Sequence, residues 1–159
     1  MGSGAILGET LAAADLLEED FDIQADVWSV TSFNELSREG RSTVRWNTLH
    51  PEEKQKTSYV TQCLKEEKGP VIAATDYVAN YAEQIRAFVP QHYVALGTDG
   101  FGRSGTRAQL REFFEVDRHY IALAAVKALA DDNAVPTSTV SDALSRYGIN
   151  SNKPDPFHS

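Results

Sequence analysis

The fold class is decided by the stretch His92-Tyr-Val-Ala-Leu-Gly-Thr-Asp-Gly-Phe-Gly-Arg-Ser-Gly-Thr-Arg107. It begins with a short apolar run, Tyr93–Leu96, which has the length and the composition of a buried strand. A glycine-rich turn follows, and after it apolar residues recur at helical spacing. A strand, a glycine loop and a helix form the unit from which open α/β sheets are built. The stretch therefore predicts an α/β fold whose functional loops lie at the carboxyl end of the sheet.

The same loop contains Gly100-Phe-Gly-Arg-Ser-Gly105, which matches the G-x-G-x-x-G pattern of dinucleotide-binding sites. That fingerprint needs a second parallel strand after the helix, with an acidic residue about 20 positions on. The chain continues instead into residues 117–130, which are rich in Ala and Leu and predict another helix. A tight turn and close packing of helix on strand explain the glycines. A small nucleotide-binding protein that uses this loop stays as the alternative function.

The composition predicts one domain, because 159 residues with 42% hydrophobic side chains can build one sizeable core. We expect this domain at 1–150 and a loosely held polar tail at 151–159. The 15 basic and 23 acidic side chains give a net charge of −8, which argues against nucleic-acid and anionic-membrane partners. The single cysteine, Cys63, excludes an internal disulfide. With no signal peptide and no apolar run of spanning length, the sequence predicts a cytoplasmic protein.

The remaining segments alternate between the two kinds of element, which predicts a mostly parallel sheet covered on both faces. Further strands are expected at 25–30 and 71–74, and helices at 6–21, 33–40, 59–64, 77–88 and 136–147. In the helix at 77–88, we expect five side chains to face inward: Val78, Tyr81, Ala82, Ile85 and Phe88. The opening Gly2-Ser-Gly4 leads directly into a helix, as such glycines do after a strand. Either these glycines are a leader at the start site or a first strand has been cut away, and we favour the second explanation.

No catalytic, cofactor-binding or metal-ligating set emerges from the residues. The four histidines stand at positions 50, 92, 119 and 158, and no two are three or four apart, so no zinc pattern exists. Neither a phosphate-binding loop nor a nucleophile elbow is present. For Cys63, an inert buried thiol is favoured over a nucleophile.

Three arginines form a local basic cluster at Arg103, Arg107 and Arg111. Together they could grip a carboxylate or phosphate of a neighbouring chain. Pairing within the chain, to Glu112 or Glu115, is the favoured alternative.

Three segments together resemble a known family. They are Ala25-Asp-Val-Trp-Ser-Val-Thr-Ser-Phe-Asn-Glu-Leu36, Tyr59-Val-Thr-Gln-Cys-Leu64 and Leu96-Gly-Thr-Asp-Gly-Phe-Gly-Arg-Ser104. The chain, from Gly2 to about Pro154, resembles the C-terminal domain of the homodimeric bacterial pyruvate dehydrogenase decarboxylating component, a thiamine diphosphate-dependent member of the transketolase superfamily. The resemblance implies a three-layer α/β/α sandwich with a mostly parallel sheet of about five strands, the first of them truncated.

The resemblance also implies that the cofactors lie elsewhere in a parent enzyme. In the family a first domain holds the diphosphate and Mg²⁺, and a second domain holds the aminopyrimidine ring and supplies the catalytic glutamate. Here only Thr98-Asp-Gly100 resembles the start of the metal–diphosphate motif, and the later asparagines are missing. No thiamine diphosphate or Mg²⁺ is therefore expected on this domain.

The function expected from the resemblance is assembly and dimerisation within an enzyme that decarboxylates pyruvate and passes the acetyl group to lipoyl groups. The domain is expected to be inactive alone. Its expected partners are the other domains of the parent, the homodimer mate and, as a further candidate, the dihydrolipoyl acetyltransferase core. Ten residues of two loops are the candidate contacts: Thr31, Ser32, Asn34, Glu35, Asp99, Gly100, Phe101, Gly102, Arg103 and Ser104.

Overall fold

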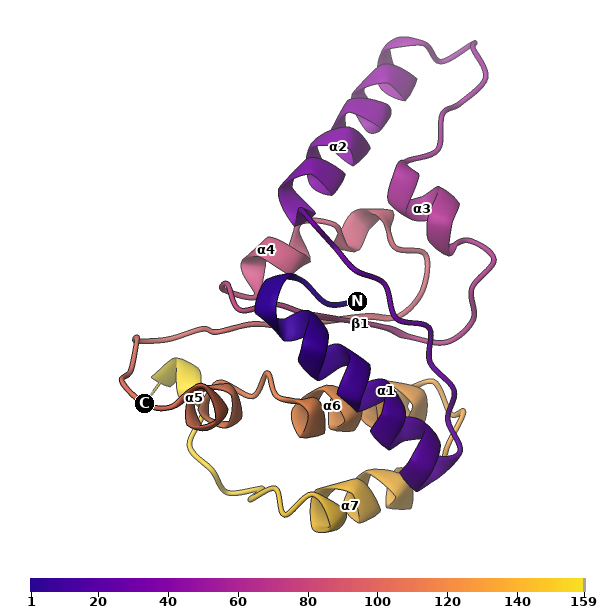
Figure 1. The fold of residues 1–159 in the computed structure, drawn as a ribbon. Coiled ribbons are helices and arrows are strands. Elements are labelled where there is room, and N and C mark those ends of the chain that lie inside the picture. The colour runs from indigo at the N-terminus through magenta and orange to yellow at the C-terminus, as the bar shows by residue number, and fades with distance from the viewer. Residues whose placement is uncertain (159) are drawn as a thin grey trace.

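The computed structural model describes residues 1–158 and places helices on both faces of a small parallel sheet (Figure 1). Strands β1 (Val71–Ala74) and β2 (Tyr93–Leu96) pair in parallel, with Val71 opposite Tyr93. The helices are α1 (Leu7–Phe21), α2 (Phe33–Leu49), α3 (Tyr59–Leu64), α4 (Asn80–Glu83), α5 (Arg107–Phe113), α6 (Arg118–Asp131) and α7 (Thr137–Arg146). Three 3-10 turns are η1 (Gly4–Ile6), η2 (Arg86–Phe88) and η3 (Pro156–His158). The predicted α/β class is confirmed.

The centre of the sheet is occupied by residues 1–3. Gly2 forms parallel bridges to Ser29 on one side and to Ala74 of β1 on the other. The Gly2 amide donates to the Trp28 carbonyl at 2.9 Å, and the Ser3 amide donates to the Ala74 carbonyl at 3.1 Å. Among residues 1–158 only β1 and β2 form a regular ladder, so the predicted count of about five strands is wrong. The strand expected at 25–30 is reduced to the single bridge at Ser29, because only a short segment lies beside it to pair with.

Two hydrophobic cores lie on opposite faces of the sheet, as strand geometry requires. Ile72 and Ala74 of β1 point into a core with α1 and α6, whereas Ala73 points into a core with α3 and the segment around α4. Side chains of the first core include Ile6, Ala13, Leu17, Ile121, Ala122 and Val126, and those of the second include Phe33, Val60, Leu64, Ala82, Ile85 and Tyr93. The three-layer arrangement of the α/β prediction follows from these two cores.

Two helices differ from their predicted lengths. The helix expected at 33–40 continues to Leu49 as α2, whose far end projects from the body of the molecule (Figure 1). The helix expected at 77–88 is shortened to α4 and η2, and Val78 and Tyr81 are exposed instead of facing inward. The amide of Thr98 donates to the carbonyl of Tyr77 at 2.8 Å, and this bond to the loop after β2 replaces the first helical turn. A tertiary contact therefore overrides the helical pattern.

Two residues of the polar tail contact the body, Lys153 and Pro156. The Lys153 ammonium donates to the carbonyls of Glu112 at 2.7 Å and Phe113 at 2.8 Å, at the end of α5. Pro156 is buried, and its carbonyl lies directly against Gly100. Ser159 lies outside the described residues.

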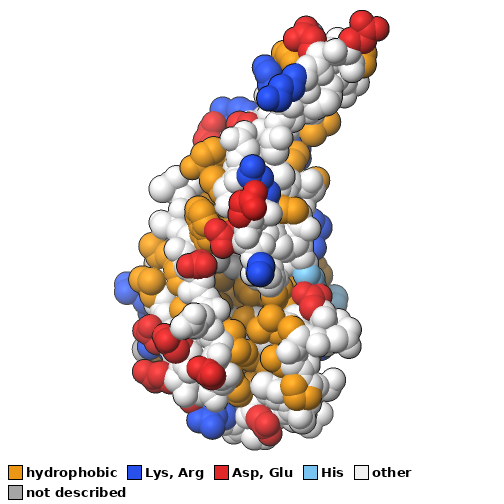
Figure 2. Space-filling model, turned by 90° about the vertical axis from the view of Figure 1, so that its right-hand side faces the viewer, with side chains coloured by type: hydrophobic (Ala, Val, Ile, Leu, Met, Phe, Trp, Pro, Cys, Tyr) orange, Lys and Arg blue, Asp and Glu red, His pale blue; other side chains and the backbone are white. Residues whose placement is uncertain are grey.

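A slot extends from Met1 between residues 24–28 and the start of β1, with a volume of about 220 Å³. Its apolar lining comes from α1, from α6, from residues 23–28 and from the start of β1, and Figure 2 shows the hydrophobic hollow on this face. The Met1 ammonium sits at the inner end and donates to the Ile72 carbonyl at 2.7 Å. Burial lowers the pKa of this ammonium from 8.0 to about 6, because a charge is disfavoured away from water.

The buried ammonium should make stability depend on pH. Between pH 6 and 8 the unfolded chain binds more protons at Met1 than the folded chain, so the free energy of unfolding should rise with pH there, by roughly 2–3 kcal/mol. Acetylating the N-terminus removes the charge and should remove this rise. Urea unfolding of the free and the acetylated chain at several pH values measures the difference in the free energy of unfolding. Titration of the histidines contributes equally to both forms and drops out of this difference. Parallel pH profiles for the two forms would contradict the burial of this charge.

Candidate functional site

The loops that follow β1 and β2 are joined to each other at the carboxyl edge of the sheet. The Thr98 hydroxyl donates to the carbonyl of Asp76 at 2.8 Å. Both carboxylate oxygens of Asp99 accept from the Ala79 amide, each at 3.3 Å. Gly97 makes the approach possible, since a Cβ there would collide with the backbone of Ala79. The predicted loop residue Asp99 thus fixes the segment before α4 rather than facing solvent alone.

The glycine loop is held on its other side by the tail. Gly100 has a φ of +99°, and a Cβ on it would collide with the Pro156 carbonyl, so this position requires glycine. Gly102 has open space around it. Phe101, between them, is 82% exposed, and it presents the most exposed large hydrophobic side chain among the described residues. The loop therefore has a fixed base and an apolar tip.

Nothing in this geometry supports nucleotide binding by the loop. Helix α5 has only seven residues, and its first turn is closed by a capping box in which the Thr106 hydroxyl accepts from the Gln109 amide at 3.3 Å. Within residues 1–158 the chain then enters α6 and α7, and no strand follows. The second parallel strand of a dinucleotide-binding unit is thus missing from the described chain.

The other predicted loop, at 31–35, lies at the start of α2. Ser32 caps this helix by accepting from the Glu35 amide at 3.2 Å. Glu35 itself pairs with Arg38 at 3.0 Å on the surface. Asn34 accepts a hydrogen bond at 3.1 Å from Gln84, just after α4. The exposed residue Thr31 precedes the cap.

The segment 76–84 joins the two predicted loops, since it contacts Asp99 near one end and Asn34 near the other. Sequence reasoning missed it as a site because its apolar residues fit a buried helical face. The exposed pair Tyr77 and Tyr81, whose ring centroids are 5.3 Å apart, marks it as surface. Two aromatic residues four positions apart are equally compatible with a buried helical face, so the sequence does not distinguish an exposed pair from a buried one.

The three predicted arginines stay close together in the structure, since all of them line one hollow. The Arg103 guanidinium lies over the ring of Phe113, 4.4 Å from its centroid. Arg107 lines a hollow of about 580 Å³ with Arg103 and Gly100. Arg111 also lines this hollow and pairs with Glu9, at 2.7 Å, so pairing within the chain is confirmed but with a different partner from those expected. Ser104 is exposed in the loop.

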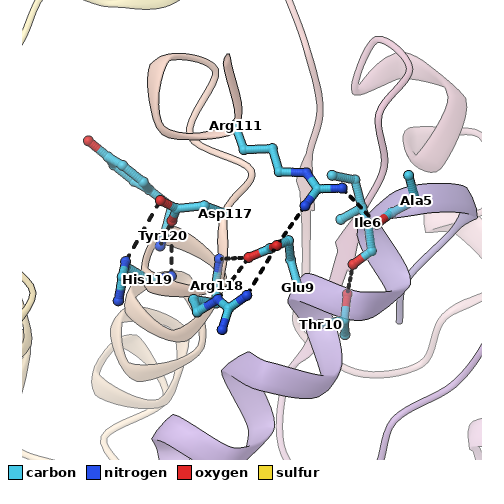
Figure 3. Close-up of polar contacts among 9 residues, drawn as sticks. All are labelled: Ala5, Ile6, Glu9, Thr10, Arg111, Asp117, Arg118, His119 and Tyr120. Carbon is cyan, nitrogen blue, oxygen red and sulfur yellow. Dashed lines mark hydrogen bonds and ion pairs between the residues drawn. The ribbon is translucent and has the colours of Figure 1, made fainter. Parts of the chain in front are cut away.

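Glu9 is the one buried charged residue of the described chain, at 7% exposure (Figure 3). One carboxylate oxygen accepts from Arg111 at 2.7 Å, and the other accepts from the Arg118 side chain at 3.0 Å and from its amide at 3.1 Å. Asp117 caps the same end of α6 by accepting from the amides of His119 and Tyr120. Figure 3 shows the carboxylate of α1 reaching the start of α6 while Arg111 approaches from α5. The network fixes three helices together beside the carboxyl edge.

The two arginines also keep Glu9 ionised. Burial alone would raise the pKa of its carboxyl group, but the hydrogen bonds from Arg118 and the positive charges of Arg118 and Arg111 lower it below the usual 4.5. A carboxylate with a lowered pKa and filled hydrogen-bonding positions is a weak general base near neutral pH. The network therefore has a structural role.

Histidine, cysteine and metal chemistry receive no support from the described residues. His50 stacks on Trp46 with a centroid distance of 4.4 Å, and the Nδ1 atom of His92 lies 3.0 Å from Asp132. Cys63 is a free, partly buried thiol. Across residues 1–158 no three His, Cys, Asp or Glu side chains gather in a way that could hold a metal ion. Over the same range no helix has both the length and the apolar character to cross a membrane.

Replacing Glu9 tests the network. Glu9→Gln keeps the size but leaves two arginines without their negative partner, so the free energy of unfolding at pH 7 should fall by about 2–4 kcal/mol. Because the folded pKa lies below 4.5, this stability is present above pH 4.5 and should be lost as the pH falls below it. Glu18→Gln, on the exposed side of α1, is the matched control and should change little. Equal urea midpoints for the two variants would refute the role of Glu9.

Residues 1–117 match the family model described as "Transketolase-like TK C-terminal domain". The chain is 57% identical to the pyruvate dehydrogenase E1 component of Pseudomonas aeruginosa over 158 residues and 54% identical to that of Cupriavidus necator over 157 residues, in both cases over 99% of this chain. The component of Escherichia coli K12 is 43% identical over 98% of this chain. In each case the chain spans only 18% of the relative's length. The chain therefore belongs to the family of transketolase-like C-terminal domains and is homologous to the C-terminal part of pyruvate dehydrogenase E1 components.

Proposed function

We propose that this chain acts as the C-terminal assembly domain of a pyruvate dehydrogenase E1 component and does not decarboxylate pyruvate alone. The observation that carries the proposal is the match of 99% of the chain to 18% of the relatives. Such a match makes the chain a counterpart of one part of a larger enzyme. Its role would be to support the neighbouring domains and to add to the contact between two copies of the parent.

Thiamine diphosphate and Mg²⁺ would be held by the remaining domains of the parent, and they supply the decarboxylation chemistry when bound there. The residues of this chain do not fit them. Mg²⁺ needs several oxygen ligands, and the acid of Thr98-Asp-Gly100 already accepts from the Ala79 amide. Within residues 1–158 no cluster of further carboxylates surrounds that acid.

Two exposed apolar features support a role in assembly. Phe101 stands at the tip of the glycine loop, and the Tyr77–Tyr81 pair lies on the adjoining segment. Both extend from the edge to which the carboxyl ends of β1 and β2 point, where α/β proteins place their functional loops. Large aromatic side chains exposed on a rigid base are typical anchors of protein interfaces. This edge is therefore the surface proposed to meet the other domains and the homodimer mate.

The dihydrolipoyl acetyltransferase core stays a further candidate partner. It differs from the first proposal only in what the surface contacts. A pull-down of this chain with the subunit-binding domain of the core distinguishes them, since retention would add the core as a partner and no retention would leave assembly within the parent.

A chimera tests the proposed function. Replacing the corresponding C-terminal part of the Pseudomonas aeruginosa E1 component with these 159 residues should give an assembled enzyme that decarboxylates pyruvate at a rate within about tenfold of the parent's. The isolated chain should show no decarboxylation with thiamine diphosphate and Mg²⁺. Activity of the isolated chain, or a stable but inactive and unassembled chimera, would overturn the proposal.

The apolar loop tip can be tested in the same chimera. Phe101→Ser should weaken dimerisation about tenfold or more, because a buried aromatic anchor is removed. In the isolated chain the same change should alter the free energy of unfolding by less than about 0.5 kcal/mol, since Phe101 is exposed there. Phe101→Tyr is the conservative control. Sedimentation equilibrium of the three chimeras gives the dimerisation constants, and identical values would rule out Phe101 as a contact.

A further inference from the structure

A polar groove with a volume of about 760 Å³ separates the first half of α2 from the segment 78–84. Its lining comes from α2 and from residues 78–84, and no residue of the loop around Phe101 takes part in it; Figure 1 shows α2 and α4 as neighbours. The hydrogen bond from Gln84 to Asn34 joins the two walls at 3.1 Å. Ser37, at the base of the α2 wall, is buried. The groove is thus a fixed feature of the fold rather than a gap between loose segments.

Three arginines on one face of α2 form the first wall. Arg38, Arg41 and Arg45 are spaced by three and four residues, so they lie along the same side of the helix. Arg38 pairs with Glu35 at 3.0 Å, but both side chains are largely exposed, and such pairs contribute little. Among residues 1–158 no ion pair is formed by Arg41 or Arg45. Two guanidinium groups are therefore free to bind an anion.

The charge of the groove is opposite to that of the chain. Its described lining holds three arginines and no Asp or Glu, whereas the whole chain carries a net charge of −8. Guanidinium groups bind carboxylates in a planar, two-bond geometry. A local positive groove on a negative protein attracts a local negative group without attracting polyanions in general.

The second wall is apolar. Val78 is 43% exposed and Tyr81 is 39% exposed, and both line the groove opposite the arginines. The helical pattern predicts that both side chains face the core, but the structure leaves them exposed. They are therefore open to contact with a partner. Tyrosine and arginine are enriched at protein interfaces because each combines a broad contact surface with hydrogen bonding.

The spacing of the arginines defines the kind of ligand. From Arg38 to Arg45 the helix rises about 10 Å, at about 1.5 Å per residue. A single carboxylate or phosphate cannot reach both ends, so the ligand must carry several anionic groups along a chain. The apolar wall favours a peptide over a nucleic acid, because a peptide can place apolar side chains against Val78 and Tyr81.

We propose that the groove between α2 and α4 binds an acidic peptide segment of a partner protein. Its carboxylates would contact Arg38, Arg41 and Arg45, and its apolar side chains would pack on Val78 and Tyr81. The groove shares Tyr81 with the edge proposed for assembly of the parent, but its three arginines lie outside that edge, so the arginine variants test this proposal separately.

Binding of a model peptide tests the proposal on the chain itself. The probe is a fluorescein-labelled peptide of about ten residues in which Glu and Asp alternate with Leu and Phe, followed by fluorescence anisotropy. We expect saturable binding in the micromolar range that weakens as salt is raised from about 0.05 to 0.3 M, since ion pairs are screened. The double variant Arg41→Ala/Arg45→Ala should weaken binding about tenfold or more, and Tyr81→Ser should also weaken it.

Three controls decide the outcome. Arg107→Ala removes an exposed arginine outside the groove and should leave the affinity unchanged. A peptide whose apolar residues are replaced by Ser should bind more weakly, and an oligodeoxythymidine of equal charge should not compete. Equal loss for Arg107→Ala and the double variant, or tighter binding of the oligonucleotide than of the peptide, would overturn the proposal. Circular dichroism should show unchanged folding of the double variant, because both arginines are exposed.

Discussion

The structure depends on the hydrogen bonds that residues 1–3 make to both sides at the centre of the sheet. The Gly2 amide and carbonyl form hydrogen bonds to the backbone on either side of Ser29. The Ala74 amide donates to the Met1 carbonyl at 3.0 Å. Because α1 begins immediately afterwards, these bonds also fix the helix that fills one core. Backbone groups buried in the middle of a sheet are costly to leave unpaired. The three residues therefore bond to a segment that lies 72 positions further along the sequence.

Elements defined by local patterns could be predicted, and elements defined by distant contacts could not. The apolar run of β2 is encoded within a few residues. The shortened α4 depends instead on a bond between Tyr77 and Thr98, and the partner of Arg111 is Glu9, 102 positions away. Glu112 and Glu115 are close in sequence and are plausible partners, but the buried carboxylate of Glu9 needs a positive partner more than an exposed one does. Spacing along a helix does not reveal which neighbouring helix supplies the partner.

The candidate surfaces show the same division. The glycine loop and the start of α2 stand out in the sequence through their glycines and cap, and the structure brings both against the segment 76–84. The sequence does not mark the segment 76–84 as surface, because aromatic residues four positions apart occur on exposed and on buried helical faces alike. Net charge is an average too: a value of −8 argues against anionic partners in general, yet a groove with three arginines lies within the same chain. The positive charge of the groove can be identified only from the fold, which places α2 beside α4.

Native-state hydrogen exchange at the centre of the sheet tests this account most directly. The amides of Gly2, Val30 and Ala74 make the bonds that join the three inner segments. If these bonds hold the fold together, the three amides should exchange only through global unfolding, as slowly as the most protected amides of α6. Fast exchange at Gly2 and Ala74 with α6 still protected would show that residues 1–3 are an accessory to a sheet that stands without them.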